Sequence, residues 1–335
     1  MFVDTSKYFK PESVTYYDPK KDHRVVFLTG ATSGIGWYTC LHLYLHGYIV
    51  YIASRNEDRL VKTIEDIKVE AFKRTENYSD DEKASRPLGE LYYIQLDLSD
   101  LSTVPKAVEQ FGKRENKLDI LINNAGLMAV PYQMTKDGYE IQYQVNFVGH
   151  LLLTLQLLPF IKESDTTPRI INLSSFGHNF EFKYFHPSEH DFNKFPNAIY
   201  TWVRYGKAKV SQIHLTKALA SQYPEILSFA VHPGIVFGTG LFDYYKSIPI
   251  LKYLNKAAFE VSDKIAGSTN EEGSLATLRA AMDPELTLEK DNGSYLVTGG
   301  SIEIPSKVAT TQENIDETWN WNIEELKKRG FNFSI

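Results

Sequence analysis

The sequence predicts one α/β domain in which a parallel sheet carries helices on both faces, a doubly wound arrangement. Two observations predict it. Short apolar runs of the kind found in strands buried on both faces alternate with longer amphipathic runs over almost the whole chain. No repeat, low-complexity tract or linker divides the 335 residues, so residues 24–335 are predicted to form a single domain.

The alternation predicts seven strands, at about residues 24–29, 48–54, 91–96, 118–122, 169–173, 227–231 and 293–297. Helices are expected at about residues 35–46, 57–75, 136–162, 202–223, 274–282 and 313–329, with a further helix starting near residue 98. Residues 1–23 are predicted to be a surface arm. Residues 76–89 are charged and carry Pro and Gly, which predicts an exposed loop insertion.

A glycine-rich turn joins the first strand to the first helix. It comprises Gly30, Thr32, Ser33, Gly34, Ile35 and Gly36. Gly30 allows a tight turn, Gly34 lets the backbone approach a pyrophosphate, and Gly36 lets the helix pack closely. The helix N-terminus offers free N–H groups to phosphates. This strand, turn and helix predict a dinucleotide-binding domain of the Rossmann type.

The end of the second strand bears on which dinucleotide binds. A protein that binds NAD usually has an acidic residue there, whereas this chain has Ser54 followed by Arg55. An arginine can pair with a 2′-phosphate that a carboxylate would repel, which favours NADPH or NADP⁺ over NADH. The alternative is that Arg55 is only a solvated charge. Ser33, where many proteins that prefer NADP have a basic residue, weakens the argument.

Two further strand ends are candidate cofactor contacts. Asp97 and Leu98 follow the third strand, and Asp97 could bind the adenine amino group or cap a turn. Asn124, Ala125 and Gly126 follow the fourth strand, where small residues admit a ribose and amides can fix neighbouring strands. A plain turn would use Asn and Gly as well.

Tyr205 and Lys209 lie four residues apart in a predicted helix and therefore on one face of it. A phenol has an ordinary pKa of about 10. A nearby ammonium and an oxidised nicotinamide would lower that pKa. The pair therefore predicts a tyrosine that exchanges a proton with a carbonyl or alcohol oxygen.

These features occur together and in order, with Asn146, Ser174-Ser175 and His232-Pro233-Gly234 at suitable spacings. Over about residues 24–300 the chain resembles the short-chain dehydrogenase/reductase family. Within it, the long segment between Ser175 and Tyr205 is similar to that of retinol-dehydrogenase-like and fungal carbonyl-reductase-like members, among them yeast proteins associated with lipid droplets.

The resemblance implies a catalytic tetrad. Tyr205 would protonate the carbonyl, and Ser175 would hydrogen-bond the same oxygen. Lys209 would hold the nicotinamide ribose and lower the tyrosine pKa. Asn146 would position Lys209 through a water and a backbone carbonyl. Relatives commonly form homodimers through the helices that follow strands four and five.

The resemblance also implies that Pro233, Gly234 and Val236 contact the nicotinamide. Aromatic and apolar residues would line the substrate pocket; the candidates are Met128, Phe176, Phe180, Trp202, Phe237 and Phe242. Residues 176–200 would form a substrate loop and residues 235–264 a mobile lid. The lid's apolar residues could instead be core, a dimer contact, or a peripheral contact with a lipid surface.

Composition narrows the possible partners and location. The net charge is −6 and the sequence shows no basic patch, so nucleic acid is not expected as a partner. The longest apolar stretch, residues 151–161, is too short to span a bilayer. The histidine pairs lack further ligands, so no metal is expected. A single cysteine and the lack of a signal sequence fit a cytoplasmic protein, with lipid-droplet association as an option.

The sequence therefore predicts an NADPH-dependent carbonyl reductase, able to run as an alcohol dehydrogenase on a bulky apolar substrate. Two alternatives stay open. One is a retinol- or steroid-type dehydrogenase that acts at a lipid-droplet surface. The other is a non-catalytic module that senses NADP(H).

Overall fold

The computed structural model describes residues 5–189, 191, 193–194, 196–234, 236 and 268–333. Its centre is an eight-stranded sheet with the order β3-β2-β1-β4-β5-β6-β7-β8. The strands are β1 (Val25–Thr29), β2 (Ile49–Ser54), β3 (Glu90–Gln95), β4 (Ile120–Asn123), β5 (Arg169–Leu173), β6 (Leu227–Val231), β7 (Tyr295–Leu296) and β8 (Ile302–Glu303). The order reverses between β1 and β4, the place where such sheets bind ligands at their carboxyl ends.

The predicted seven parallel strands are all present, but the expectation of a purely parallel, seven-stranded sheet is wrong by one strand. β8 pairs with β7 in the antiparallel direction. It has two residues, both exposed, and follows a turn at Gly299 and Gly300, which have φ angles of +74° and +102°. Two exposed residues are too few to show hydrophobic alternation, so no sequence pattern predicts this strand.

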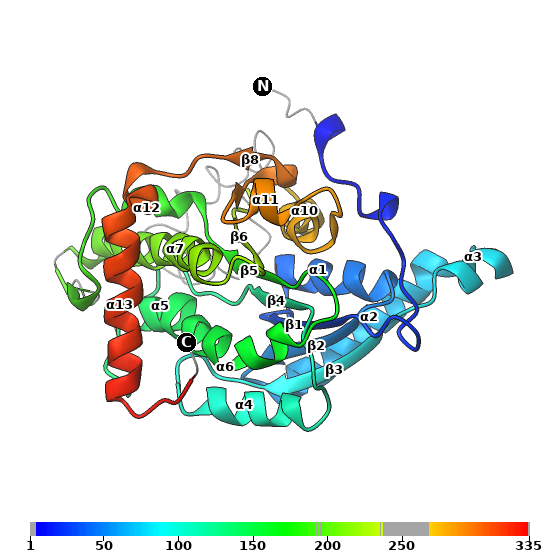
Figure 1. Ribbon diagram of the computed structural model, residues 1–335, viewed down its shortest axis with the longest axis horizontal. Helices are drawn as coiled ribbons and strands as arrows, with labels where there is room; N and C mark the ends of the chain where they lie inside the picture. Colours follow the sequence, from blue (N-terminus) through cyan, green and yellow to red (C-terminus); the bar gives the residue numbers. More distant parts are fainter. Residues whose placement is uncertain are drawn as a thin grey trace, which may run out of the picture.

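Helices cover both faces of the sheet (Figure 1). One face carries α1 (Gly34–Leu45), α2 (Glu57–Thr75) and α10 (Asn270–Met282). The other carries α4 (Thr103–Gly112), α5 (Ile141–Tyr143), the π-helical segment η3 (Gln144–Val148), α6 (Gly149–Lys162) and α7 (Asn197–Gln222). The last helix, α13 (Gln312–Lys328), packs on the outside of α7.

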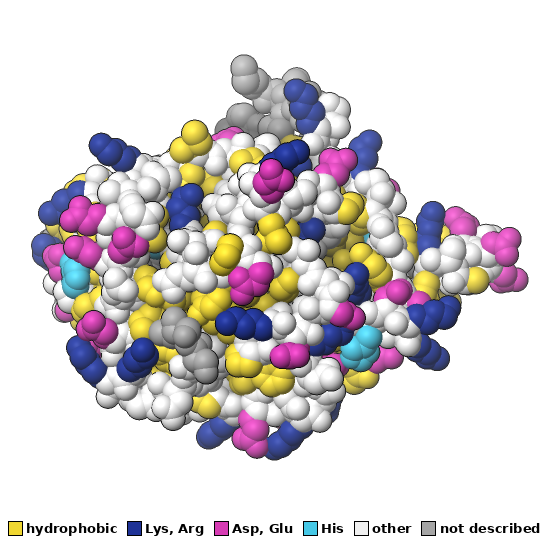
Figure 2. Space-filling view, in the orientation of Figure 1, with side chains coloured by type: hydrophobic (Ala, Val, Ile, Leu, Met, Phe, Trp, Pro, Cys, Tyr) yellow, Lys and Arg dark blue, Asp and Glu magenta, His cyan; other side chains and the backbone are white. Residues whose placement is uncertain are grey.

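Short elements complete the described chain. They are α3 (Asp80–Ser85), α11 (Leu288–Asp291), α12 (Lys307–Thr310) and the 3₁₀ turns η1 (Thr5–Lys7), η2 (Pro11–Ser13), η4 (Phe176–Phe180), η5 (Pro187–Glu189) and η7 (Thr298–Gly300). The segment expected as a loop insertion thus contains a helix. Ser79 and Glu82 cap α3 reciprocally, each side chain bonding the other's backbone N–H. Figure 2 shows α3 projecting from the body with charged side chains of both signs around it.

Four helix starts differ from those predicted by several residues. α10, expected from residue 274, begins at Asn270 after the capping box of Thr269 and Glu272. The helix expected from residue 136 begins at Ile141, because the Glu140 carboxylate accepts hydrogen bonds from the first-turn N–H groups of Gln142 and Tyr143. The helix expected near residue 98 begins at Thr103, since Asp97 and Asp100 hold the intervening residues in turns. α7 begins after Pro196, five residues before the expected start.

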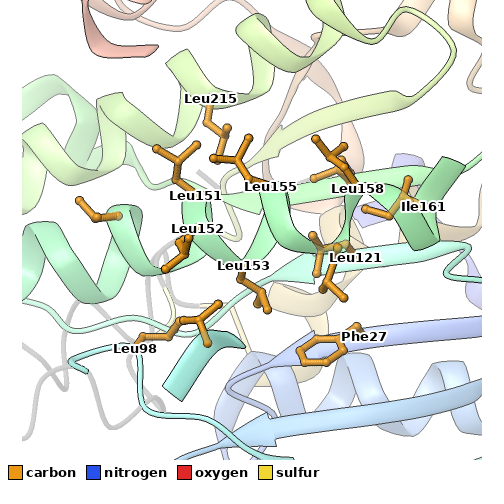
Figure 3. Packing of buried hydrophobic residues seen from close by; sticks show 14 of the residues in the cluster. Phe27, Leu98, Leu121, Leu151, Leu152, Leu153, Leu155, Leu158, Ile161 and Leu215 are labelled. Atoms are coloured by element: carbon orange, nitrogen blue, oxygen red, sulfur yellow. The ribbon is translucent and has the colours of Figure 1, made fainter. Parts of the chain in front are cut away.

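The helical run Ile141–Lys162 has 22 residues and is apolar enough by composition to cross a membrane. The apolar stretch judged too short from sequence is therefore part of a longer helix. However, 83% of its most apolar window is buried in the protein. Figure 3 shows why: Leu153 points towards Leu121 and Phe27 of the sheet, and Leu155 lies towards Leu215 of α7. It is a core helix between two layers.

Both ends of the described chain lie against the domain. Tyr17 of the N-terminal segment donates its backbone N–H to His46, and Phe9 donates to Gly299. At the other end, α13 buries Ile315, Trp319 and Leu326 against the core that includes α7. One face of α7 is therefore covered by α13.

We expect Leu155→Ala to destabilise the domain by about 2 to 5 kcal/mol, because Leu155 is fully buried between α6 and α7 and truncation leaves a cavity. Guanidinium unfolding measures the change. Phe72→Ala is the control, since Phe72 on α2 is 67% exposed and should change the free energy of unfolding by less than about 0.5 kcal/mol. Equal effects of the two substitutions would contradict the assigned core.

Candidate active site

The carboxyl ends of the parallel strands bring the predicted site residues to one edge of the sheet. After β1, Gly30 and Gly34 have φ angles of +72° and +57°, which favour glycine. A β-carbon on Gly36 would lie 2.3 Å from the carbonyl oxygen of Gly30. Residue 36 must therefore be glycine for α1 to begin so close to the turn. Thr32 and Ser33 are accessible at the start of α1, and Ile35 is buried.

The turn after β4 is tied to the glycine-rich turn. Asn124 Nδ2 donates to the carbonyl oxygens of Thr29 (2.8 Å) and Gly30 (3.0 Å). In return, the Thr29 hydroxyl accepts from the backbone N–H groups of Asn124 (2.9 Å) and Ala125 (3.0 Å). The amide of Asn124 fixes neighbouring strand ends, as expected from the sequence. The two cofactor-binding segments are thus one unit.

The residues proposed to read the adenosine end lie at the next strand ends. Ser54 ends β2, and Arg55 follows it as an exposed residue. In the described part of the chain the Arg55 side chain makes no hydrogen bond or ion pair. One oxygen of Asp97 accepts from the N–H and hydroxyl of Ser99, which is the turn role weighed as an alternative. Leu98 is buried against Gly149 of α6.

Tyr205 and Ser175 lie side by side at the carboxyl end of β5. Tyr205 is 4% exposed and its phenol hydrogen-bonds the Ser175 hydroxyl. Ser175 Oγ also accepts from the backbone N–H of Gly177 at 3.0 Å. A β-carbon on Gly177 would lie 2.5 Å from Tyr205 Cε1, so the turn η4 presses directly on the tyrosine ring. The structure brings the predicted acid and its partner together.

Burial raises the pKa of Tyr205 to about 12, and the hydrogen bond from Ser175 opposes this rise. Burial also lowers the pKa of Lys209 to about 7. Burial and Ser175 are the causes of the shift at Tyr205, and the lowering of the tyrosine pKa by Lys209 beside a nicotinamide stays a prediction. The ammonium, 5.6 Å from the Tyr205 ring, itself loses charge in the same dry surroundings. The phenol stays protonated at neutral pH, as a proton donor requires.

Lys209 and Asn146 meet beside Gly126. A β-carbon on Gly126 would lie 3.2 Å from Asn146 Oδ1 and 3.7 Å from Lys209 Nζ. Lys209 Nζ donates to the carbonyl oxygen of Leu173 at 2.8 Å. Asn146 instead uses its side-chain amide on Leu127, accepting from the N–H at 2.6 Å and donating to the carbonyl at 2.8 Å. Lys209 Nζ thus makes one hydrogen bond and the Asn146 side chain makes two, and the two side chains lie next to each other.

The backbone carbonyl of Asn146, through which the resemblance would connect it to Lys209, already has partners. Gln212 Nε2 donates to it, and His150 Nδ1 lies 3.3 Å away. His150 Nε2 is 2.9 Å from the Thr29 hydroxyl. Burial lowers the pKa of His150 to about 3, so the ring is neutral and can accept from Thr29 while donating to Asn146. This connects the cofactor turn to the tetrad.

Thr29, His150 and Gln212 were not among the predicted site residues. Two signals were available in the sequence: His150 follows Asn146 by four residues, and Gln212 follows Lys209 by three, so each shares a helix face with a tetrad member. The sequence contains no signal for the π-helical segment η3, in which Asn146 lies. A π-helical segment departs from the regular i→i−4 hydrogen bonds, which leaves the Asn146 carbonyl available to side chains.

Four of the predicted pocket residues gather around Tyr205. Met128 packs with Tyr205 and Trp202. The rings of Phe180 and Trp202 are 5.5 Å apart, and those of Phe176 and Phe180 are 6.5 Å apart, both edge-on. Phe176 is 57% exposed, so part of this aromatic wall faces outwards. Phe237, Phe242 and nearly all of the predicted lid, residues 235–264, lie outside the described residues.

Residues after β6 form the remaining wall. Gly234 has a φ angle of +90°, and a β-carbon there would lie 2.7 Å from the Thr298 hydroxyl oxygen. Pro233 precedes it, and Val236 is buried against Gly273 of α10. The positions of Pro233, Gly234 and Val236 are compatible with the nicotinamide contacts expected of them.

Comparisons with known proteins agree with this geometry. A family model for short chain dehydrogenase matches residues 24–185. The chain is 31% identical to the short-chain dehydrogenase/reductase drtF of Aspergillus calidoustus, over 93% of this chain and 96% of the relative. It is 31% identical to retinol dehydrogenase 12 of Mus musculus, over 90% of this chain and 86% of the relative.

A solved structure is similar as well. The Pseudomonas aeruginosa RhlG/NADP active-site complex aligns with a TM-score of 0.59 at 20% identity, covering 84% of this chain and 96% of that one. The chain therefore belongs to the short-chain dehydrogenase family. It is an oxidoreductase fold of the retinol-dehydrogenase-like type, as its sequence relatives indicate.

We expect Thr29→Val to destabilise the protein by about 2 to 4 kcal/mol and to weaken binding of the dinucleotide, because two backbone N–H groups and His150 lose their partner. Thr29→Ser keeps the hydroxyl and should cost about 1 kcal/mol. Chemical unfolding and fluorescence titration with NADPH measure both effects. A valine variant no worse than the serine variant would show that the hydroxyl does not hold this edge together.

Proposed function

We propose that this protein is an NADP(H)-dependent oxidoreductase that reduces a bulky apolar ketone or aldehyde, with Tyr205 as the proton donor. The observation that carries the proposal is the buried phenol of Tyr205, hydrogen-bonded to Ser175 and next to Lys209, at the edge where the glycine-rich turn lies. Gly30 and Gly36 let the glycine-rich turn lie directly against the turn after β4 and the start of α1, because β-carbons there would meet Ala125 and the Gly30 carbonyl oxygen. The N-terminus of α1 is therefore at the same edge, where its N–H groups can bind phosphates.

A nicotinamide bound at this edge would supply the hydride that adds to the carbonyl carbon. The chain's own residues handle the proton. Tyr205 gives its phenolic proton to the carbonyl oxygen as the C–O π bond breaks, which yields the alcohol. Ser175 Oγ is already satisfied as an acceptor by Gly177, so its own hydrogen can point to the same oxygen. Ser175 thus orients the carbonyl towards Tyr205.

Lys209 restores the proton and fixes the ribose. One N–H of its Nζ is used on Leu173, and two hydrogens remain when it is charged. They can bind ribose hydroxyls at the place that Gly126 leaves open. Because burial lowers the pKa of Lys209 to about 7, it can pass a proton towards the Tyr205 phenolate and regain one from solvent near neutral pH.

The aromatic wall sets the class of substrate. Met128, Phe180 and Trp202 offer apolar surface around the phenol. An aryl ketone, an apolar aldehyde, a retinoid or a steroid would bury its apolar surface there. The similarity to retinol dehydrogenase 12 favours a retinoid- or steroid-type substrate as the second candidate.

We expect Tyr205→Phe to lower the rate of NADPH oxidation with aryl ketones and apolar aldehydes by about 100- to 10,000-fold, because the proton donor is removed while the ring remains. Steady-state kinetics measure this. The control is Tyr92→Phe in β3, which is remote from the carboxyl edge and should retain full activity. A Tyr205→Phe enzyme that keeps its rate would remove Tyr205 as the acid. A wild-type protein that binds NADPH but reduces no carbonyl would instead support a sensing module.

Cofactor preference tests Arg55. We expect Arg55→Asp to shift the ratio of kcat/KM for NADPH over NADH towards NADH by about 10- to 100-fold, because a charge-assisted hydrogen bond to the 2′-phosphate is lost and a repulsion is gained. Arg59→Asp in α2 carries the same change in charge and is the control. An unchanged ratio, or an equal shift in the control, would mean that Arg55 does not read the phosphate.

A further inference from the structure

A second polar cavity lies at the opposite edge of the sheet from the candidate active site. It has a volume of about 350 Å³ and opens where the strands begin. Arg24 precedes β1, Tyr48 precedes β2, Asp119 precedes β4 and Arg169 is the first residue of β5. The segment after α10 closes the other side. The proposed oxidoreductase chemistry uses none of these residues.

Two guanidinium groups line this cavity without an ionic partner. Arg169 donates to the backbone carbonyls of Ala280 (2.9 Å) and Asp283 (2.8 Å). These hydrogen bonds satisfy the carbonyls at the end of α10 but do not neutralise the positive charge of Arg169. Arg24 lies over the ring of Tyr17, 5.0 Å from its centroid. No ion pair among the described residues includes either arginine. Burial lowers the pKa of Arg169, and the charge of Arg24 acts in the same direction.

The carboxylates nearby are already engaged. Asp119 accepts from the backbone N–H of Val25 at 2.8 Å and from the Ser164 hydroxyl at 2.6 Å, and Lys117 lies 3.6 Å from it. Asp283 pairs with Arg279 at 2.9 Å. The lining therefore holds two cations and one anion that has its own cation. Two like charges held close in a partly buried cavity are costly unless an anion compensates them.

The rest of the lining combines apolar and aromatic side chains with three threonines, Thr166, Thr167 and Thr287. Met282 and Leu286 are buried, Leu288 is 37% exposed, and the Tyr17 ring packs edge-on against Tyr48 at 5.2 Å. Convergent polar groups beside apolar side chains are typical of small-molecule sites, and the volume is at the lower end for such sites. It equals that of roughly a dozen water molecules. A ligand here would need an anionic head and a short apolar body.

We propose that this cavity is a second ligand site that binds a small amphipathic oxyanion, with its carboxylate or phosphate on Arg24 and Arg169 and its alkyl part against Met282, Leu286 and Leu288. Guanidinium groups bind both kinds of oxyanion through paired N–H donors. The site is separate from the dinucleotide edge, so it does not depend on the proposed function.

Calorimetric titration of the full chain with octanoate, octyl phosphate and octanol tests the site. We expect saturable binding of at least one anion and at least about tenfold weaker binding of octanol, since a hydrogen bond to a charged group is lost. The tighter of the two anions identifies the head group. Equal binding of octanol, or no saturable binding of either anion at millimolar concentration, overturns the proposal.

Variants localise the binding. Arg24→Gln should weaken the anion about tenfold or more. Leu288→Asp, at the partly exposed end of the apolar wall, should also weaken binding of the anion about tenfold or more, because its carboxylate repels the anion. This variant still tests the proposal if Arg24→Gln misfolds. The control is Arg114→Gln, an exposed arginine that also lies over a tyrosine ring, 5.4 Å from the centroid of Tyr92. Binding that survives both test variants, as it would if octanoate entered the candidate active site, contradicts the assignment.

Discussion

The contact between η4 and α7 is the constraint on which the candidate site depends. A β-carbon on Gly206 would lie 2.9 Å from the carbonyl oxygen of Gly177 and 2.8 Å from the backbone nitrogen of Glu181. Gly177 in turn leaves no room for a β-carbon beside Tyr205. Two glycines thus let a turn and a helix touch through their backbones. This brings Ser175 to the phenol and buries the tyrosine, while Ser175 stays partly exposed.

Buried charges hold α7 in this position. Arg204 and Glu140, both fully buried, lie 3.4 Å apart, and the carboxylate also caps α5. Lys207 lies 4.0 Å from Glu181 and donates to the carbonyls of Phe185 and His186. Breaking such a pair leaves a buried charge without compensation, which is strongly destabilising. The Arg204–Glu140 pair therefore fixes α7 to the start of α5, and the Lys207–Glu181 pair fixes it to the substrate loop.

Much of this arrangement could be predicted from the sequence, because it follows from local patterns. Buried strands read as continuous apolar runs, and Gly30, Gly34 and Gly36 mark the turn. Tyr205 and Lys209 share a helix face. What could not be predicted depends on tertiary contacts. Burial raises the pKa of Tyr205, the Asn146 carbonyl is held by Gln212, and β8 is too short to leave a pattern. The sequence does not indicate that the carboxylate of Glu140 sets where α5 begins.

The direct test of the central claim is a crystal structure of the protein with a bound nicotinamide dinucleotide. We expect the pyrophosphate at the turn of Gly30–Gly36 and the nicotinamide ring beside the Tyr205 hydroxyl, with the nicotinamide ribose hydroxyls on Lys209. A nicotinamide ring that lies away from Tyr205, or a dinucleotide bound at another edge of the sheet, would contradict it.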